Sequence, residues 1–465
     1  MKRLSLVVPD GVGVRNFVLG PFLGEAARRA DVSVLHGLDG EDARRLAQDS
    51  GVTVPWEPFF AGSDPRLSMV LRKTVAYGHM YRGNTLAMMA NLARRPVGAW
   101  RRRALDDALK TLGRLAARLD LVDPLDRVHL AHVGRRPEVG LYRRHFAERR
   151  PSVVFSSNQR SLTVVPVVLA ARSLGIPTAA FIFSWDNLTS KGRIAAPFDH
   201  FLVWSALMRD ELLRFYPSVT ADRVHVVGTP QFDPYANRAL LSSREEFFDR
   251  IGADPSRRLV CFSGGDSGTC PEDPEHLGIL LRLVREGRVP GSPQIVLRPS
   301  PVDSGERYER IRREFPELLY APPSWIRPTA GDWARVVPMP EDLPFLTNLI
   351  FHSDVNVNMA STMTLDFAAF DKPIVNLAFD VSDPPLFGRP IRELYYRYDH
   401  YLPVVRLGAA RFARSPDELA SHLAAYLEDP GLDRDARRRL LDLEVGAPMG
   451  DSSRRVLDAL LEIAA

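Results

Sequence analysis

Three short segments of the sequence carry residue types that can bind a phosphate or move a proton. The first segment follows an apolar run and holds two serines and three glycines: Ser263, Gly264, Gly265, Ser267 and Gly268. Glycines at such a place let backbone N–H groups approach an anion. The segment has neither the Gly-Lys-Ser/Thr of a Walker loop nor the pattern Gly-x-Gly-x-x-Gly. A phosphate cradle and an ordinary tight turn both fit it.

The second segment, residues 353–367, has the pattern of a strand, a turn of small residues and a helix. Ser361 and Thr362 are expected at the N-terminus of that helix, where hydroxyls and the first backbone N–H groups suit a diphosphate. Asp366 lies about one helical turn further on, where a carboxylate can accept from the hydroxyls of a ribose. The alternative is an ordinary serine cap followed by a solvated aspartate.

The third segment places Trp185, Asp186, Asn187 and Lys191 directly after an apolar strand. Such side chains are costly to bury unpaired, and polar loops at strand ends are common places for sites. We expect Asp186 to be a general base that activates a hydroxyl, with Lys191 as a contact for an anion. Arg298, at another strand end, is expected to neutralise the charge of a leaving group. The alternative for Asp186 is an Asx-turn or a helix cap.

Two more stretches are expected to complete this site. The backbone around Val337 and Met339 would flank a nucleotide base, and the glycine-rich start, with Asp10, Gly11 and Arg15, would line the side of a second substrate. Because helix ends and an arginine can carry the charge of the phosphates, no metal or other cofactor is expected.

The elements that must position these residues follow from the alternation of short apolar runs with helical patterns, which is typical of parallel α/β units. Strands are expected at 4–8, 32–35, 153–156, 178–183, 201–204, 259–263, 294–297, 336–337, 355–357 and 374–377. The sequence predicts one Rossmann-like domain at 1–235, with a helical insertion at about 60–150, and a second at 236–465. We expect ligands between the carboxyl ends of the two sheets.

Composition narrows the function classes. The chain has 465 residues, two cysteines, no apolar run long enough for a membrane span and a net charge of +4 carried mostly by arginine. Clusters such as Arg101-Arg102-Arg103 are either solvated helix faces or a basic surface for anionic lipid or a charged acceptor. They lack interleaved aromatic residues, so nucleic acid is not an expected partner. We expect a cytoplasmic protein, with association at the inner membrane surface left open.

The run from Met359 to Asp380 resembles the nucleotide-binding segment of the CDP-glycerol glycerophosphotransferase and capsular-polysaccharide transferase group, which belongs to the GT-B superfamily. The matching positions are Ser361-Thr362, Asp366, Lys372-Pro373 and Asp380. The turn at residues 227–233 is similar to the turn that precedes the second domain in that group. The resemblance covers roughly residues 180–400. It departs at Asp186 and Ser300, where the group has histidines.

The resemblance implies two facing Rossmann-like domains of the GT-B type and a metal-independent transferase. The reaction expected first is transfer of a sugar or polyol phosphate from a nucleotide-diphosphate donor to a glycan or lipid-linked acceptor, in the assembly of cell-surface polysaccharide. The alternatives are a nucleotide-sugar 2-epimerase or hydrolase, and a non-catalytic scaffold of an envelope-assembly complex.

Overall fold

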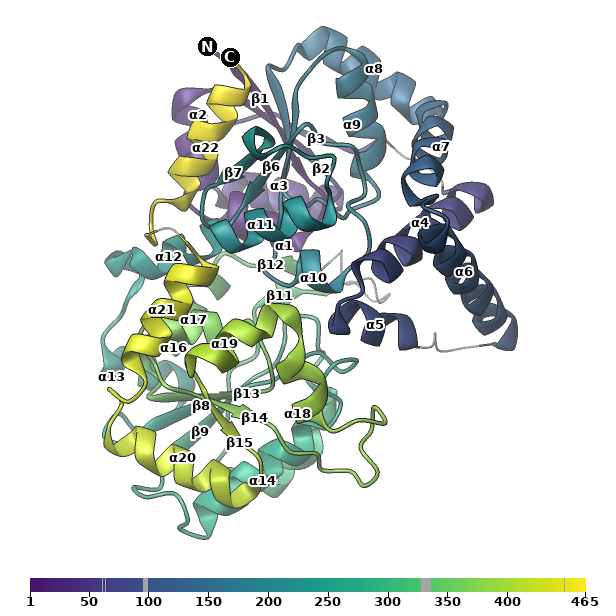
Figure 1. The fold of residues 1–465 in the computed structure, drawn as a ribbon. Coiled ribbons are helices and arrows are strands. Elements are labelled where there is room, and N and C mark those ends of the chain that lie inside the picture. The colour runs from purple at the N-terminus through teal and green to yellow at the C-terminus, as the bar shows by residue number, and fades with distance from the viewer. Residues whose placement is uncertain (61, 63, 95–98, 328–335, 447) are drawn as a thin grey trace. The chain divides into compact units, whose positions relative to one another are not determined.

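The computed structural model describes residues 1–60, 62, 64–94, 99–327, 336–446 and 448–465. The chain divides into two compact units (Figure 1). Unit 1 consists of Met1–Gln231, Tyr398–His400 and Gly446–Ala465, and unit 2 consists of Phe232–Arg397 and Tyr401–Val445.

Unit 1 is built on a seven-stranded sheet with the order β3-β2-β1-β4-β5-β6-β7, in which every neighbouring pair is parallel. Its strands are β1 (Arg3–Val8), β2 (Asp31–His36), β3 (Trp56–Pro58), β4 (Val153–Ser156), β5 (Thr178–Phe181), β6 (His200–Val203) and β7 (Val224–Val226). The strand order changes direction between β1 and β4. In such sheets this is the point where ligands bind, beyond the carboxyl ends of the strands.

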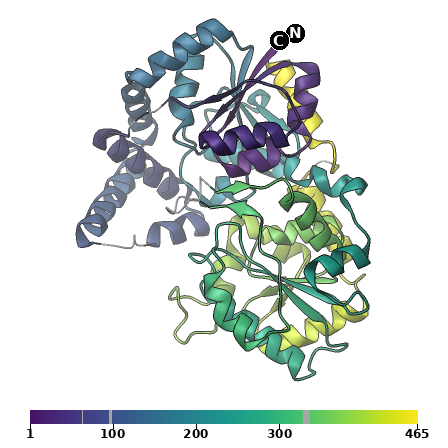
Figure 2. The same ribbon diagram turned by 180° about the vertical axis from the view of Figure 1, so that it is seen from behind.

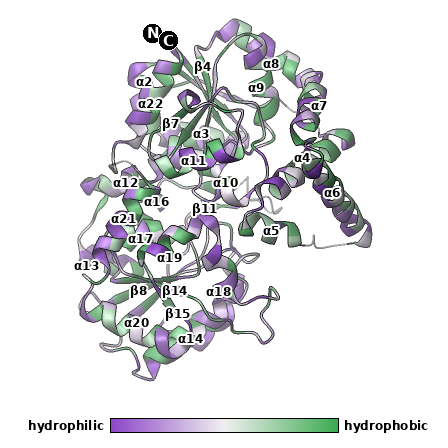
Figure 3. Ribbon diagram, viewed as in Figure 1, coloured by the Kyte–Doolittle hydropathy of each residue, from purple (hydrophilic) through white to green (hydrophobic). Residues whose placement is uncertain are grey.

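Helices cover both faces of this sheet, as Figures 1 and 2 show together. They are α1 (Gly11–Phe17), α2 (Phe22–Arg29), α3 (Gly40–Asp49), α9 (Val164–Ser173), α10 (Asn187–Ser190), α11 (Ala206–Phe215) and α22 (Ser452–Ile463). Helix α9 is mainly hydrophobic in Figure 3 because it lies between the sheet and another helix, α8 (Pro137–Arg149). A helix buried on two sides has no need of a polar face.

Between β3 and β4, the described residues form five helices of the insertion that the sequence predicts. They are α4 (Arg66–Gly83), α5 (Leu86–Ala93), α6 (Trp100–Arg118), α7 (Val122–Gly134) and α8 (Pro137–Arg149). Helices α4 and α6 cross with their backbones in contact, since a Cβ on Gly113 would lie 2.9 Å from the amide nitrogen of Gly78. Beside this crossing, Val75, Ala116 and Val122 form a small hydrophobic core.

Unit 2 is built on a six-stranded parallel sheet with the order β10-β9-β8-β13-β14-β15, and β11 and β12 form a separate antiparallel pair. The strands are β8 (Leu259–Ser263), β9 (Gln294–Arg298), β10 (Leu319–Tyr320), β11 (Trp325–Ile326), β12 (Val337–Pro338), β13 (Val355–Asn358), β14 (Ile374–Leu377) and β15 (Arg411–Ala413). Asn358 pairs in register with Ser263, so the loops that follow β8 and β13 begin side by side.

The helices of unit 2 alternate with these strands. They are α12 (Asp233–Ala236), α13 (Arg244–Ile251), α14 (Asp273–Arg285), α15 (Glu309–Glu314), α16 (Asp342–His352), α17 (Met363–Ala369), α18 (Ile391–Leu394), α19 (Leu402–Leu407), α20 (Pro416–Glu428) and α21 (Arg434–Glu444). None of the helices within the described ranges is long and apolar enough to cross a membrane.

The predicted fold class is confirmed: the chain contains two Rossmann-like α/β units, and the first carries a helical insertion. The sequence placed residues 446–465 in the second domain, whereas the structure assigns them to unit 1. The reason is that α22 packs on α2, where Arg29 and Asp458 form an ion pair of 2.7 Å. The apolar run expected as a strand at 336–337 lies in the small antiparallel pair rather than in the main sheet.

Candidate functional site

Polar side chains gather in unit 1 where β1, β4 and β5 end. Asp10 caps the N-terminus of α1 by accepting from the amide of Gly13 at 3.0 Å, and the side chain of Asn158 also donates to it. Gln159 donates to the side-chain oxygen of Asn187 at 2.9 Å. These residues are buried, so their hydrogen bonds tie three loops into one fixed arrangement at the edge of the sheet.

Asp186 is the most strongly held carboxylate of this cluster. Three side chains donate to it: Ser184 Oγ at 2.6 Å, Ser190 Oγ at 2.7 Å and Asn187 Nδ2 at 3.0 Å. Lys191 lies 3.3 Å away as an ion-pair partner. Burial by itself raises the pKa of Asp186, but Lys191, His400 and the serine hydroxyls outweigh it and hold the pKa far below its usual value. Asp186 is therefore ionised and a weak base.

His400, which sequence reasoning did not select, lies against the same loop. Its Nδ1 is 3.1 Å from the hydroxyl of Thr189, and the ring of Trp185 meets it edge-on at 5.6 Å. Burial lowers the pKa of His400 to about 4, so the imidazole is neutral at pH 7. Its Nε2 makes no hydrogen bond with a residue that the structure describes, which leaves that nitrogen able to accept a proton.

Glu211 on α11 is a second group that sequence reasoning missed. Helix α11 packs against α10, which carries the loop of Asp186. Burial and the charges of Asp399 and Asp186 raise the pKa of Glu211 to about 8. The cluster thus holds an ionised carboxylate, a neutral imidazole and a protonated carboxyl. Titratable groups whose environments drive their pKa values apart can serve as a base and an acid.

The residues expected on the side of the second substrate lie in this part of unit 1. Asp10, Trp185, Asn187 and Lys191 belong to the hydrogen-bonded loops described above, and Gly11 is buried at the first position of α1. Arg15, on the same helix, donates from Nη2 to the side chain of Gln231 at 2.8 Å and from Nε to Asn16 at 3.0 Å. The structure therefore brings five of these six residues into one cluster. The sixth, Arg15, instead forms hydrogen bonds with Gln231 and Asn16 of unit 1.

The glycine loop after β8, in unit 2, uses its own acceptors. The amide of Gly265 donates to Asp273 Oδ2 at 2.7 Å, and the amides of Gly268 and Thr269 both donate to Asp266 Oδ1 at 3.0 Å. Two carboxylates therefore take up the backbone donors that the sequence assigned to a phosphate.

Close packing explains why Gly264 and Gly265 of this loop are glycines. A Cβ on Gly264 would lie 2.4 Å from the hydroxyl of Tyr308, and one on Gly265 would lie 2.5 Å from Cys270 Sγ. Of the two serines, Ser263 is buried and accepts from Asn356 at 2.8 Å, whereas Ser267 is exposed. Close packing of the loop thus requires glycine at both positions whether or not a ligand binds.

The turn before α17 is held by a network of buried asparagines. The amide of Ser361 donates to Asn358 Oδ1 at 3.0 Å, and that oxygen also accepts from Asn376 at 3.1 Å. Ser361 Oγ in turn accepts from the amide of Met363 at 3.2 Å, which occupies another donor at the start of the helix. Ser361 and its neighbour Thr362 are only partly buried, so their hydroxyls lie near the surface of unit 2.

Asp366 and Arg298 are both buried and paired within unit 2. Asp366 is 3% exposed and accepts from the hydroxyl of Tyr235 at 2.6 Å. Arg298 donates from Nη2 to both oxygens of Asp342, at 2.8 and 3.0 Å. Asp342 also accepts from Trp325 Nε1 at 2.8 Å, so this ion pair lies inside a satisfied hydrogen-bond network. The roles expected for Asp366 and Arg298 stay predictions.

Val337 and Met339 lie where the β11–β12 pair ends. Val337 is buried and pairs with Ile326, whereas Met339 is partly buried and its amide donates to Ser324 O at 2.9 Å. Only the partly buried Met339 offers side-chain surface for a contact with a nucleotide base, which stays a prediction.

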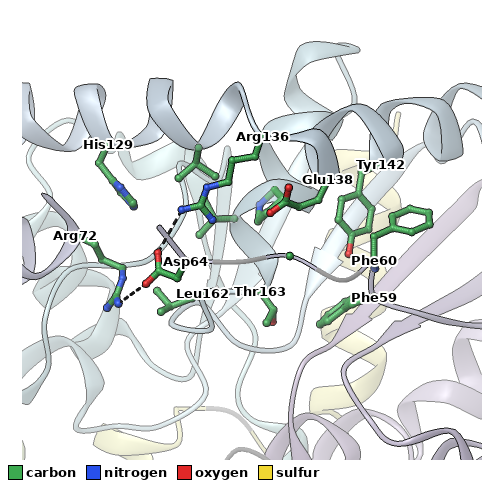
Figure 4. A pocket seen from close by; sticks show the side chains of 14 residues that line it. Phe59, Phe60, Asp64, Arg72, His129, Arg136, Glu138, Tyr142, Leu162 and Thr163 are labelled. Carbon is green, nitrogen blue, oxygen red and sulfur yellow. Dashed lines mark hydrogen bonds and ion pairs between the residues drawn. The ribbon is translucent and has the colours of Figure 1, made fainter. Parts of the chain in front are cut away.

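A cavity of about 150 Å³ lies within unit 1, where the insertion packs on α9. Figure 4 shows the carboxylate of Asp64 between Arg72 and Arg136, at distances of 2.9 and 3.3 Å. Tyr142 and Phe60 close another side, and the hydroxyl of Tyr142 accepts from the amide of Phe60 at 3.0 Å. An aspartate of the chain therefore already supplies the negative charge beside these two arginines.

No protein-family model matches the chain, and no curated protein matches it in sequence. Solved structures do match it along its whole length. The UDP-GlcNAc 2-epimerase from Neisseria meningitidis bound to UDP-GlcNAc has 11% identity and a TM-score of 0.57, with 99% of this chain and 100% of that chain covered.

Two more solved structures match in the same way. A putative UDP-N-acetylglucosamine 2-epimerase from Listeria monocytogenes has 10% identity and a TM-score of 0.54, covering 99% of this chain and 96% of that one. The S. aureus MnaA–UDP structure has 10% identity and a TM-score of 0.53, covering 100% and 98%. This chain has the GT-B fold. At such identities the comparison shows the fold and no more.

The comparison corrects the function that the sequence placed first. The matching structures named above are UDP-GlcNAc 2-epimerases and an MnaA–UDP structure, and none of them is a glycosyltransferase by its description. The expectation of a glycosyltransferase or polyol-phosphate transferase is therefore wrong, and the alternative of a nucleotide-sugar 2-epimerase is favoured. The specific resemblance to the CDP-glycerol glycerophosphotransferase group is likewise unsupported.

Proposed function

We propose that this chain binds a nucleoside-diphosphate sugar and inverts the configuration at C2 of the sugar, without transfer to an acceptor. The observation that carries the proposal is the cluster of Asp186, His400 and Glu211, which differ in protonation at neutral pH. The match to UDP-GlcNAc 2-epimerases over the whole chain supports it and makes UDP-N-acetylglucosamine the first substrate to test.

Inversion at C2 requires a base that removes the C2 proton and an acid that returns a proton to the opposite face. The C2–H bond of a nucleotide sugar is not next to a carbonyl group, so its cleavage has to accompany departure of the nucleoside diphosphate from C1, which leaves a C1=C2 double bond. Return of a proton to the opposite face of C2 then accompanies re-formation of the C1–O bond to the same diphosphate. His400 is proposed as the base because its Nε2 is neutral and has no partner among the described residues. Glu211 is proposed as the acid, since it carries a proton at pH 7.

Asp186 takes a different role from the one expected from the sequence. Its carboxylate is a weaker base than His400, because its pKa is held far below the usual carboxylate value, whereas the pKa of His400 is lowered only to about 4. It is proposed to stabilise positive charge on His400 after proton transfer, since it is the largest of the charges that raise the pKa of that histidine. Lys191 balances the carboxylate between turnovers.

The proposal is tested by incubating the protein with UDP-N-acetylglucosamine and no acceptor, followed by chromatography of the sugar nucleotides. We expect the 2-epimer, UDP-N-acetylmannosamine, to accumulate to equilibrium. The His400→Asn and Glu211→Gln variants should each slow this conversion by about 100-fold or more, the usual contribution of a general acid or base.

Asp210→Asn is the matched control, because Asp210 neighbours Glu211 on α11 but is 66% exposed and pairs with the exposed side chain of Arg209. It should retain the rate of the unaltered protein. Equal rates for Glu211→Gln and Asp210→Asn would remove Glu211 from the reaction, and unchanged substrate after prolonged incubation would refute the proposed activity on this substrate.

A further inference from the structure

A second and larger cavity lies in unit 1, between the insertion helices α4 and α7 and the loops that follow β4 and α10. Its volume is about 320 Å³. Three arginines line it, Arg72, Arg160 and Arg193, against a single carboxylate, Asp126. The rest of the lining is mainly apolar: Val75, Ala76, Met80, Leu162, Ile194 and Ala195. The cavity is thus a basic pocket with hydrophobic walls.

The one carboxylate in the cavity is already engaged. Asp126 accepts from Arg193 Nε at 2.7 Å, and Arg193 Nη2 lies 2.7 Å from Asp123. Arg193 Nη1 is buried and has no hydrogen-bond partner among the described residues. Two carboxylates therefore balance Arg193 and offer no charge to the other arginines of the cavity.

Arg160 is the cation that the protein leaves unpaired. Its guanidinium makes no hydrogen bond or ion pair with any residue in the described ranges, and the residue is partly buried. Burial lowers the pKa of Arg160, and the charges of Asp186 and Asp10 only act on it through space. An arginine stays protonated in proteins, and a partly buried guanidinium without a hydrogen-bond partner is well suited to bind an anion.

The remaining polar groups do not supply the missing negative charge. Arg72 uses Nη2 to hold Asp64 at 2.9 Å, while its Nε is buried without a partner that the described residues provide. His129 lines the same cavity, and burial together with the charges of Arg72 and Arg136 lowers its pKa to about 4, so it is neutral. The net charge of the lining is therefore positive.

We infer that this cavity binds a small organic anion, a phosphate or carboxylate group on a short apolar fragment, with Arg160 as the main contact. The anionic group would make the hydrogen bonds that Arg160 lacks, and forked bonds from a guanidinium suit both groups. The fragment would lie against Leu162, Met80 and Ile194. A volume of about 320 Å³ is at the lower end of the range for small-molecule sites, which fits a metabolite smaller than a nucleotide sugar.

This inference does not depend on the proposed epimerisation. Its test is titration calorimetry of the full-length protein with butyl phosphate, butyrate and inorganic phosphate, in a buffer free of other anions that resemble them. Butyl phosphate or butyrate should bind with one site per chain and more tightly than inorganic phosphate. The stronger of the two identifies whether the anionic group is a phosphate or a carboxylate.

Arg160→Met is the decisive variant, and it should weaken binding at least 10-fold. The same variant should raise the melting temperature without ligand, because it removes a partly buried charge that has no hydrogen-bond partner among the described residues, whereas loss of a purely structural arginine would lower it. Arg209→Gln is the control, since Arg209 is an exposed arginine on α11 that pairs with Asp210. Ala195→Leu, which fills part of the cavity and leaves the arginines in place, should also weaken binding.

Three results would overturn the inference. The first is no heat of binding for any of the three anions at millimolar concentration, and the second is equal affinity in the unaltered protein and in both cavity variants. The third is displacement of the bound anion by UDP-N-acetylglucosamine, because it would assign the contact to the nucleotide-sugar site and not to a separate one.

Discussion

Arg298 offers the sharpest contrast between a binding role and a structural one. The Arg298→Met substitution removes two hydrogen bonds to Asp342 and one of 3.3 Å to Ala321 O, and leaves Asp342 buried without its cation. The two side chains are 5% and 6% exposed. Breaking a buried pair in this way costs about 3–5 kcal/mol. For a unit of about 210 residues this lowers the melting temperature by about 6–20 °C.

The assay is thermal unfolding followed by circular dichroism and calorimetry, with UDP binding measured at a temperature where the variant is folded. We expect Arg298→Met to melt at the lower temperature and to bind UDP with nearly unchanged affinity. Adding Asp342→Asn should recover part of the loss. The uncharged amide no longer leaves a buried negative charge, and its oxygen can still accept from the amide of Ser324, now 2.7 Å from Oδ1 of Asp342.

The result that would refute this reasoning is a variant with an unchanged melting temperature and a UDP affinity reduced 10-fold or more. Arg298 would then have to release Asp342 and bind the nucleotide, which would support the role of neutralising leaving-group charge that the sequence predicts for it. Glu317→Gln is a useful control for the calorimetry, because Glu317 forms its ion pair with Arg285 at the surface of the same unit, where the two side chains are 52% and 50% exposed.

Four further outcomes are expected. In a pH profile of kcat/KM, Glu211→Gln should remove an alkaline limb near pH 8, because the acid form of Glu211, with its pKa raised to about 8, is the active one; a limb that persists would contradict this. Burial raises the pKa of Asp273 to about 6, so the stability that its protonated form contributes to unit 2 is complete below about pH 4 and is lost as the pH rises to 6. Relative to the unaltered protein, the free energy of unfolding of Asp273→Asn should therefore rise by up to about 3 kcal/mol between pH 4 and pH 6 in urea titrations. A difference between the two proteins that stays constant with pH would refute this. Gly113→Leu should destabilise unit 1 by several kcal/mol in the same assay, since even a Cβ would lie 2.6 Å from Tyr77 Cβ, whereas Gly134→Ala at an open position should not. Vesicle co-sedimentation tests whether the arginine-rich surface of α6, where Leu112 and Leu115 are 47% and 51% exposed, binds anionic lipid. Binding to anionic vesicles should be weaker for Leu112→Glu than for the unaltered protein. Equal binding of the unaltered protein to neutral and anionic vesicles would contradict the expected attraction of arginine to anionic lipid.

The architecture could be read from the sequence because its main strands are buried on both faces. Runs such as those of β4, β8 and β14 are continuous and apolar, and their predicted bounds agree with the structure. The edge strands β3 and β10 have only three and two residues and no apolar run, so the pattern of apolar residues does not predict them. The amphipathic pattern of α22 required a partner but could not say that the partner is α2, more than 400 residues earlier in the chain.

The candidate site was predictable only where its residues are neighbours in sequence. The loop of Asp186 stood out because it concentrates polar side chains after an apolar strand. His400 lies 211 residues after Thr189, whose hydroxyl it contacts, and Glu211 looks in the sequence like a solvated residue of an ordinary helix. The sequence around either residue therefore gives no sign that it belongs to the cluster. Arg298 is the opposite case, because the sequence draws attention to it but cannot identify its partner. The sequence around an arginine at the end of a strand is the same whether that arginine binds a phosphate or, as here, the carboxylate of Asp342.

We propose above that the chain inverts C2 of a nucleotide sugar by removing and returning a proton. This proposal is tested most directly by proton NMR of UDP-N-acetylglucosamine incubated with the protein in D₂O. We expect the C2 proton signal to disappear as deuterium enters the epimerised product, and His400→Asn to abolish the exchange. A sugar nucleotide that retains its C2 proton after prolonged incubation with the folded protein would contradict it.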